Sequence, residues 1–146
     1  MSPLATHSRR TVMGLAARAD VDELAAIVGA DPPGLVILRP PEIALVMVRG
    51  RVGGDGQPFN LGEATVTRAA VRLPSGEVGH GHVLGRAPEK ARLGAILDAL
   101  WQNPRQRPRV ETGLAAVDAR LTREAEVRRR RVAATKVDFF TLVRGD

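Results

Sequence analysis

The first candidate for chemistry in this sequence is a glycine cluster, RVGGDGQPFNLG, at residues 51–62. Glycine-rich loops often bind phosphate groups through their backbone amides. A phosphate-binding loop would continue with lysine and serine or threonine and open into a helix, whereas this cluster leads into a segment with strand character. Its spacing also departs from the GxGxxG pattern of dinucleotide-binding units. The cluster is therefore predicted to be a wide connection between two strands.

A second candidate is the segment GHGH, which places His80 and His82 two positions apart on a predicted strand. Side chains at that spacing share one face of a sheet, so the two imidazoles could bind one metal ion. A metal site needs a third ligand, and His7 is the only other histidine. An incidental pair on a sheet face is the favoured interpretation. An independent metallohydrolase built on these two residues is kept as an alternative.

Nucleophilic and acid–base catalysis find little support in the residue order. Ser8 and Ser75 stand at a predicted helix start and a predicted turn, where serine commonly makes local hydrogen bonds. Glu63 and Asp98 show no pairing pattern. The chain has no cysteine, which excludes thiolate chemistry. No catalytic residue, no metal and no cofactor bound by this chain are predicted.

Arg68 and Arg72 lie on the same face of a predicted strand. Their guanidinium groups could face phosphate oxygens or the carboxylates of a partner protein. Solvation on the open face of the sheet is the simpler interpretation and is favoured from the residues alone.

The net charge of +6 is concentrated in one part of the 146-residue chain. Between residues 105 and 131, nine arginines stand against four acidic residues. Such a segment suggests a basic nucleic-acid-binding module, but it holds no aromatic side chain on which bases would stack. Nucleic acid is therefore not expected as a partner, and the basic module is kept as an alternative.

The length fits a single domain that spans residues 1–146. No segment is apolar enough over a sufficient length to cross a membrane, and the N-terminal region lacks the apolar run of a signal peptide. We therefore expect a cytoplasmic location and no membrane partner.

The elements that must position these residues are predicted from periodicity and turn signals. Two short helices are expected over residues 8–18 and 20–29, the second with a capping box. Four extended segments follow, separated by PPE, the glycine cluster and PSGE: residues 35–40, 44–52, 62–73 and 78–85. Helices are then predicted after Arg86 and over residues 110–131. The fold class is α+β, with a four-stranded antiparallel meander, N-terminal helices and two C-terminal helices.

The C-terminal segment KVDFFTLVRGD is unusually apolar for a chain end. It contains Phe139 and Phe140, two of only four aromatic residues in the sequence. Apolar side chains fall on both sides of its alternation, so one sheet face would not bury them all. The tail, residues 132–146, is predicted to dock on a partner by strand addition or phenylalanine anchors; packing on its own domain is the alternative.

Three stretches together resemble a known family: RVGGDGQPFNLGEATVTRAAVRLPSGEVGHGHVLGR, KARLGAILDALWQ and the terminal KVDFFTLVRGD. They resemble, in this order and at these distances, the G subunit of the bacterial carbon–phosphorus lyase core complex, the PhnG family. The resemblance implies a required, non-catalytic subunit in phosphonate catabolism, with subunits H, I and J as partners. The complex would transfer the ribose triphosphate unit of Mg-ATP, its substrate, to methylphosphonate. Adenine would be released, and α-D-ribose 1-methylphosphonate 5-triphosphate would form.

Under this resemblance the glycine cluster is interpreted as a shaped structural loop that lets a neighbouring backbone come close, with Phe59 as its anchor. The residues predicted to contact partner subunits are Gly53, Gly54, Gly56, Phe59, Arg68, Arg72, Phe139, Phe140 and Arg144.

Overall fold

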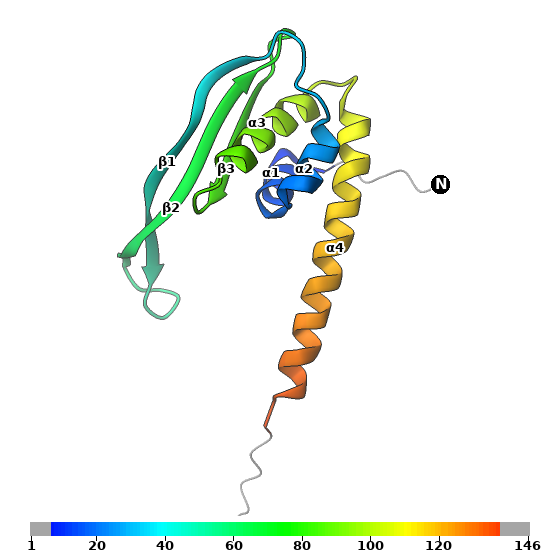
Figure 1. Ribbon diagram of the computed structural model, residues 1–146. Coiled ribbons are helices and arrows are strands. Elements are labelled where there is room, and N and C mark those ends of the chain that lie inside the picture. Colours follow the sequence, from blue (N-terminus) through cyan, green and yellow to red (C-terminus); the bar gives the residue numbers. More distant parts are fainter. Residues whose placement is uncertain (1–6, 138–146) are drawn as a thin grey trace, which may run out of the picture.

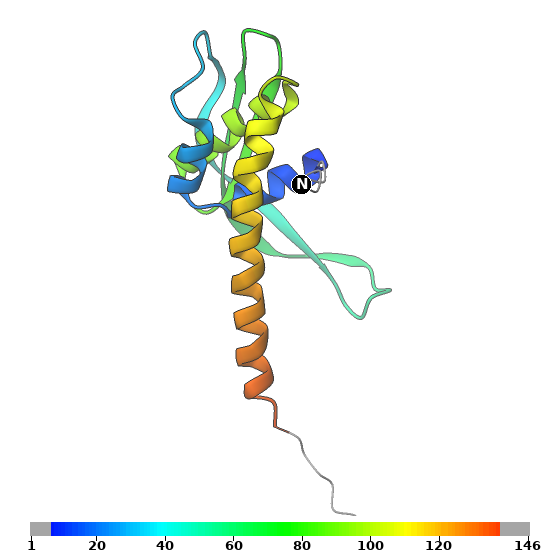
Figure 2. The same cartoon turned by 90° about the vertical axis from the view of Figure 1, so that its right-hand side faces the viewer.

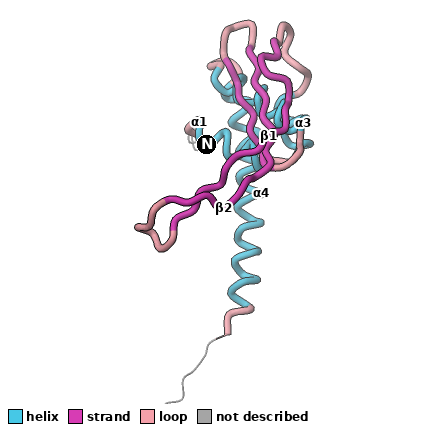
Figure 3. Tube along the Cα trace, turned by 90° about the vertical axis from the view of Figure 1, so that its left-hand side faces the viewer, coloured by secondary structure: helices cyan, strands magenta, loops and turns pink. Residues whose placement is uncertain are grey.

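The computed structural model describes residues 7–137. Within them lie α1 (Arg9–Arg18), α2 (Val21–Val28), β1 (Val36–Arg51), β2 (Pro58–Arg72), β3 (Val78–Leu84), α3 (Pro88–Gln102) and α4 (Arg107–Ala134). The helices gather on one face of the sheet and leave the other face open (Figures 1 and 3). The predicted α+β class is therefore confirmed.

The described sheet has three antiparallel strands in the order β1-β2-β3, so the prediction of four strands is wrong. The two segments on either side of PPE form the single strand β1, and the prolines do not turn the chain. Pro40 and Pro41 are tolerated because β1 is an edge strand, where a residue without a backbone N–H need not break a ladder on both sides. The pairing with β2 is irregular between Arg39 and Glu42, which absorbs the interruption.

Local signals located the helix starts. The Glu23 carboxylate accepts a hydrogen bond from the Asp20 backbone N–H at 2.8 Å, as the predicted capping box of α2 requires. The Ser8 hydroxyl accepts from the Thr11 N–H at 3.2 Å at the start of α1. Helix α4 begins at Arg107, three residues before the predicted start, because proline is readily accepted in a first helical turn.

The hydrophobic core lies between the sheet and the helical layer, with α3 at its centre (Figure 1). The apolar stripe predicted for α3 is buried as a whole: Leu93, Ile96, Leu97, Leu100 and Trp101. The first half of α4 packs against this layer through the stripe that the sequence predicts, of which Val110, Leu114 and Val117 are buried and Leu121 is partly buried.

Two glycines of GHGH set the distance between β3 and α3. A methyl group added at Gly81 would overlap the carbonyl oxygen of Ala91, and one added at Gly79 would overlap that of Ala95. The backbones of strand and helix therefore touch where side chains would otherwise separate them. In GHGH the two glycines therefore face α3, and the two histidines face away from it.

Two parts of the chain project from the body (Figure 2). The first is the end of the β1–β2 hairpin, residues 45–64, which we call the arm. Since β3 ends where Leu84 pairs with Val66, β1 and β2 pair only with each other in the arm. The second is the C-terminal half of α4, residues 122–134, in which every residue is exposed. Helix α4 has the length to cross a bilayer, but among residues 7–137 no helix is apolar enough to do so.

Candidate functional site

The glycine cluster forms the tip of the arm and joins β1 to β2. Gly53 and Gly54 have φ angles of 60° and 66°, in the left-handed region that favours glycine. The Gly56 N–H donates to the Val52 carbonyl oxygen at 3.2 Å and closes the turn. The prediction of a connection between strands is therefore confirmed, but the connection is narrower than predicted: it comprises residues 52–57, because residues 58–62 belong to β2.

The arm carries large apolar side chains that nothing in the described chain covers. Leu45 and Met47 are 63% and 60% exposed, and Leu61 and Phe59 are 63% and 42% exposed. Val48, one step along β1 from Met47, is also exposed, so both faces of the arm are apolar. Exposed apolar surface gathered on one projecting element marks a protein contact site more often than a solvated surface.

Gly50 shapes the apolar surface of the arm. A methyl group added to Gly50 would lie 2.6 Å from the Leu61 Cδ1 atom and 3.4 Å from the Phe59 Cζ atom. Leu61 and Phe59 therefore lie together over the bare backbone of Gly50. Phe59, which the sequence indicated as an anchor, is placed by this contact beside the glycine tip.

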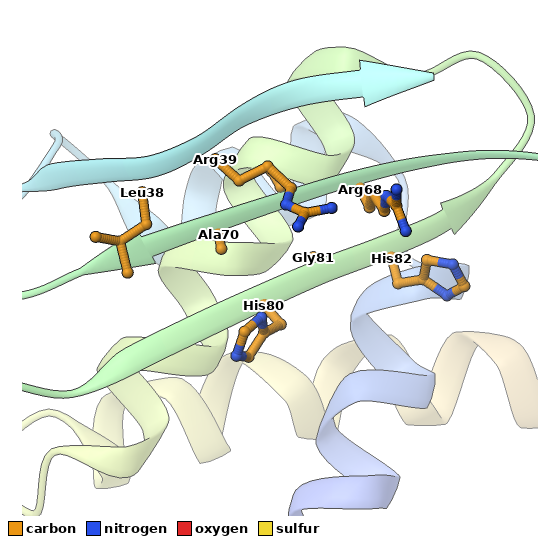
Figure 4. Close-up of a pocket in the computed structure, with 8 residues that line it drawn as sticks. Leu38, Arg39, Arg68, Ala70, His80, Gly81 and His82 are labelled. Atoms are coloured by element: carbon orange, nitrogen blue, oxygen red, sulfur yellow. The ribbon is translucent and has the colours of Figure 1, made fainter. Parts of the chain in front are cut away.

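The open face of the sheet bears a shallow hollow of about 450 Å³, lined from all three strands (Figure 4). On this face Arg68 donates through Nε to Glu42 Oε1 at 2.8 Å, and Arg39 donates through Nη1 to the same oxygen at 2.8 Å. The hydrogen bond from Arg68, with the positive charge of Arg39, lowers the pKa of the Glu42 carboxyl below its ordinary value. Both Arg68 and Arg72 are exposed, and Arg68 is held in an ion pair with Glu42.

His80 and His82 project from β3 on this open face (Figure 4). They lie beside Ala70 and Arg68 of β2, their cross-strand neighbours. In the part of the chain that the structure describes, no third histidine or carboxylate joins them in a group that could hold a metal ion. The two histidines thus lie on one face of the sheet, as their spacing predicts.

Asp98 is a buried carboxylate that the sequence left without a role. Its Oδ1 and Oδ2 accept from Nε and Nη2 of Arg9 at 3.1 and 2.9 Å, and Oδ2 also accepts from the His80 backbone N–H at 2.9 Å. Gln102 donates to the carbonyl oxygen of Val78 at 2.7 Å. Together these bonds satisfy two backbone groups on the outer edge of β3, the Val78 carbonyl and the His80 N–H, and tie the strand to α1 and α3.

Glu111 is the second buried carboxylate, and sequence reasoning missed it. Trp101 donates its indole N–H to Glu111 Oε1 at 2.6 Å, and the His7 ring bonds to Oε2. Burial alone would raise the pKa of Glu111, but the hydrogen bonds from Trp101 and His7 outweigh it and hold the pKa below its ordinary value. The sequence did contain a signal for Glu111: the indole N–H of a core tryptophan needs a hydrogen-bond acceptor, and Glu111 follows Val110 on the packed side of α4.

Several arginines of the basic segment hold α4 in place instead of facing solvent. The Arg107 guanidinium lies 4.5 Å from the Trp101 ring centroid, and its Nε donates to the Trp101 carbonyl oxygen at 2.8 Å. Arg109 donates to the carbonyl oxygen of Ile27, and Arg120 bonds to Glu23 at 2.7 and 2.8 Å. These contacts account for part of the charge that suggested nucleic-acid binding.

The predicted tail lies mostly outside the described part of the chain. Residues 132–134 belong to α4, while Phe139, Phe140 and Arg144 lie outside the described residues. The partner contacts predicted there therefore remain predictions.

The described chain thus presents exposed apolar surface on the arm, while its buried carboxylates Asp98 and Glu111 are bonded within the fold. Comparison with known proteins identifies relatives that include a subunit of a synthase. The sequence matches the family described as "Phosphonate metabolism protein PhnG" over residues 7–145. It is 53% identical over 140 residues to the "Alpha-D-ribose 1-methylphosphonate 5-triphosphate synthase subunit PhnG" of Rhizobium meliloti (strain 1021), covering 94% of this chain and 90% of that protein. The nucleic-acid alternative is not favoured by this match. The chain belongs to the PhnG family of phosphonate metabolism proteins.

Proposed function

We propose that this protein is the G subunit of α-D-ribose 1-methylphosphonate 5-triphosphate synthase, within a cytoplasmic carbon–phosphorus lyase core complex. The name of the Rhizobium meliloti relative supports the synthase assignment, since the two chains align over nearly their whole lengths. The complex transfers the ribose triphosphate unit of Mg-ATP to methylphosphonate and releases adenine.

The role proposed for this chain is required but non-catalytic. The carboxylates best shielded from water, Asp98 and Glu111, are both engaged by neighbouring side chains that join helices to the sheet or to each other. Carboxylates held in this way stabilise the fold, and their oxygens are already occupied by hydrogen bonds within the protein. This chain therefore contributes to the complex through contacts between its surface and the partner subunits.

The uncovered apolar arm is the observation that carries this proposal. A hairpin that projects from its own core gains little stability there, and its exposed side chains are the kind that a partner surface buries. We propose that the arm, with its tip at Gly53, Gly54 and Gly56 and its anchor Phe59, contacts one of the partner subunits H, I and J. Arg68 and Arg72 on the adjoining open face extend this contact, and Phe139, Phe140 and Arg144 form a second one.

The proposal is tested by tagging this chain in its own host and growing the cells short of phosphate with methylphosphonate as the phosphorus source. Recovery of subunits H, I and J in near-equal amounts at moderate salt supports it. Recovery of the tagged chain alone, or with nucleic acid only, contradicts it. A strain without this chain should also fail to grow on methylphosphonate and should recover when the wild-type chain is restored.

A further inference from the structure

The projecting half of α4, residues 122–134, is a free-standing helix. All of its residues are exposed, and in Figures 1 and 2 it leaves the body and runs on alone. It is about 20 Å long at the rise of an α-helix. A polar helix without tertiary contacts is marginally stable in water, so a partner that binds it would also stabilise it.

The charge of this half is unbalanced. It contains five arginines and two glutamates. Both glutamates are already paired along the helix: Glu124 with Arg120 at 2.8 Å and Glu126 with Arg130 at 3.4 Å. Among the described residues, no carboxylate lies within ion-pair distance of the four other arginines of this half: Arg123, Arg128, Arg129 and Arg131.

On one side of the helix, three of these arginines lie around an exposed valine, Val127. Arg123, Val127 and Arg131 follow one another at intervals of four residues and therefore form one stripe. Arg128 lies beside them, and these four residues, together with Glu124, line a shallow hollow of about 370 Å³. Val127 is 48% exposed within it. An exposed apolar side chain within a charged rim that is mostly arginine is typical of the contact surfaces between proteins.

We propose that this basic stripe of α4 docks on an acidic surface of another protein subunit in the same complex. The proposal rests on the proposed function, which supplies the protein partners, and adds the surface and its chemistry. The arginine side chains would bind partner carboxylates in bidentate fashion, and Val127 would be covered by an apolar side chain at the centre.

A second copy of this chain is a poor occupant for the stripe. The chain carries a net charge of +6, so two copies repel one another. Within residues 7–137, most of its acidic side chains are already in ion pairs, including Glu23, Glu42, Glu89, Asp98 and Glu111. Nucleic acid is also disfavoured, because α4 carries no aromatic side chain for base stacking.

The test uses the full complex. The tagged chain is co-expressed with subunits H, I and J as wild type, as Arg128→Gln with Arg131→Gln, and as Arg128→Lys with Arg131→Lys. The glutamine pair removes charge while keeping good helix formers, and we expect about tenfold less partner retained at moderate salt. The lysine pair keeps the charge but not the bidentate geometry, so it should retain clearly more partner than the glutamine pair and less than wild type. The matched control, Arg10→Gln with Arg105→Gln, changes two exposed arginines elsewhere and should have no effect.

The lysine pair also identifies the partner surface. A carbodiimide joins lysine amines directly to carboxylates, so the introduced lysines should crosslink to aspartate or glutamate residues of a partner subunit. Retention by the glutamine pair equal to wild type would overturn the proposal, as would crosslinks only to a second copy or nuclease-sensitive binding. Failure of the wild-type chain to assemble at all would instead contradict the proposed function.

Discussion

Trp101 and Glu111 meet inside the molecule, with the indole N–H 2.6 Å from the carboxylate oxygen Oε1. Each residue comes from a different helix, and the pair joins α3 to α4 beneath His7. The sole tryptophan of the chain thereby helps to hold the first turns of α4 against α3.

The Trp101–Glu111 pair predicts a pH-dependent stability. Because the pKa of folded Glu111 lies below its ordinary value of 4.5, the pair stabilises the fold above that pH, and this contribution is lost as the pH falls through the folded-state value. Glu111→Gln should cost about 1–3 kcal/mol in the free energy of unfolding at neutral pH. In urea denaturation its deficit should shrink below pH 4.5, whereas a constant deficit would contradict the assignment. Glu63→Gln, an exposed arm residue, is the control.

The contact between Gly81 and Ala91 predicts a severe effect from one methyl group. Gly81→Ala should force β3 and α3 apart and lower the free energy of unfolding by roughly 1–3 kcal/mol or more. Gly14→Ala is the matched control, since a methyl group there meets open space within a helix and should be neutral or slightly stabilising. Equal melting temperatures for the two variants would rule out the close packing.

The edge of β3 depends on Asp98. Asp98→Ala removes the acceptor of the His80 N–H and the partner of Arg9, and it should cost about 1–3 kcal/mol in the free energy of unfolding. Asp98→Asn keeps one acceptor oxygen and should cost less. Hydrogen exchange of the His80 amide measures the bond directly: exchange should accelerate most in the alanine variant, and unchanged protection would contradict the role given to Asp98.

The arm predicts a variant that folds but does not assemble. Leu45→Ser with Met47→Ser changes two side chains that are mostly exposed in the described chain, so the melting temperature should change little. The yield of co-purified subunits should fall about tenfold or more, as expected for loss of apolar anchors. Val21→Ser, which changes an exposed apolar residue on α2, should leave assembly intact. A large fall in melting temperature would show instead that the arm packs on its own domain.

The C-terminal phenylalanines give an independent prediction about assembly. Phe139→Ala with Phe140→Ala should leave the domain folded and weaken the complex. Unchanged yield of the complex would contradict a docking role for the tail. A lower melting temperature of the isolated subunit would show that these rings pack on their own domain.

Sequence alone determined the elements whose signals are local. The capping box at Asp20 and Glu23, the buried stripe of α3 and the glycine connection at residues 51–62 each depend on residues close together in the chain. Their periodicities and turn chemistry depend on neighbours in the chain, so the type of each element could be predicted, although β2 begins at Pro58, four residues before its predicted start. The family resemblance, too, was carried by short stretches that need no structure.

Tertiary structure decided what depends on neighbours distant in the chain. Pro40 and Pro41 read as a turn, yet they lie within one strand, because β1 is at the sheet edge and pairs on a single side. The bond between Trp101 and Glu111 and the contact of Gly81 with α3 arise only when separate elements pack together. Which apolar residues stay uncovered is likewise a tertiary outcome: β3 ends at Leu84, opposite Val66, and the arm beyond it projects from the body with its apolar side chains exposed (Figure 3).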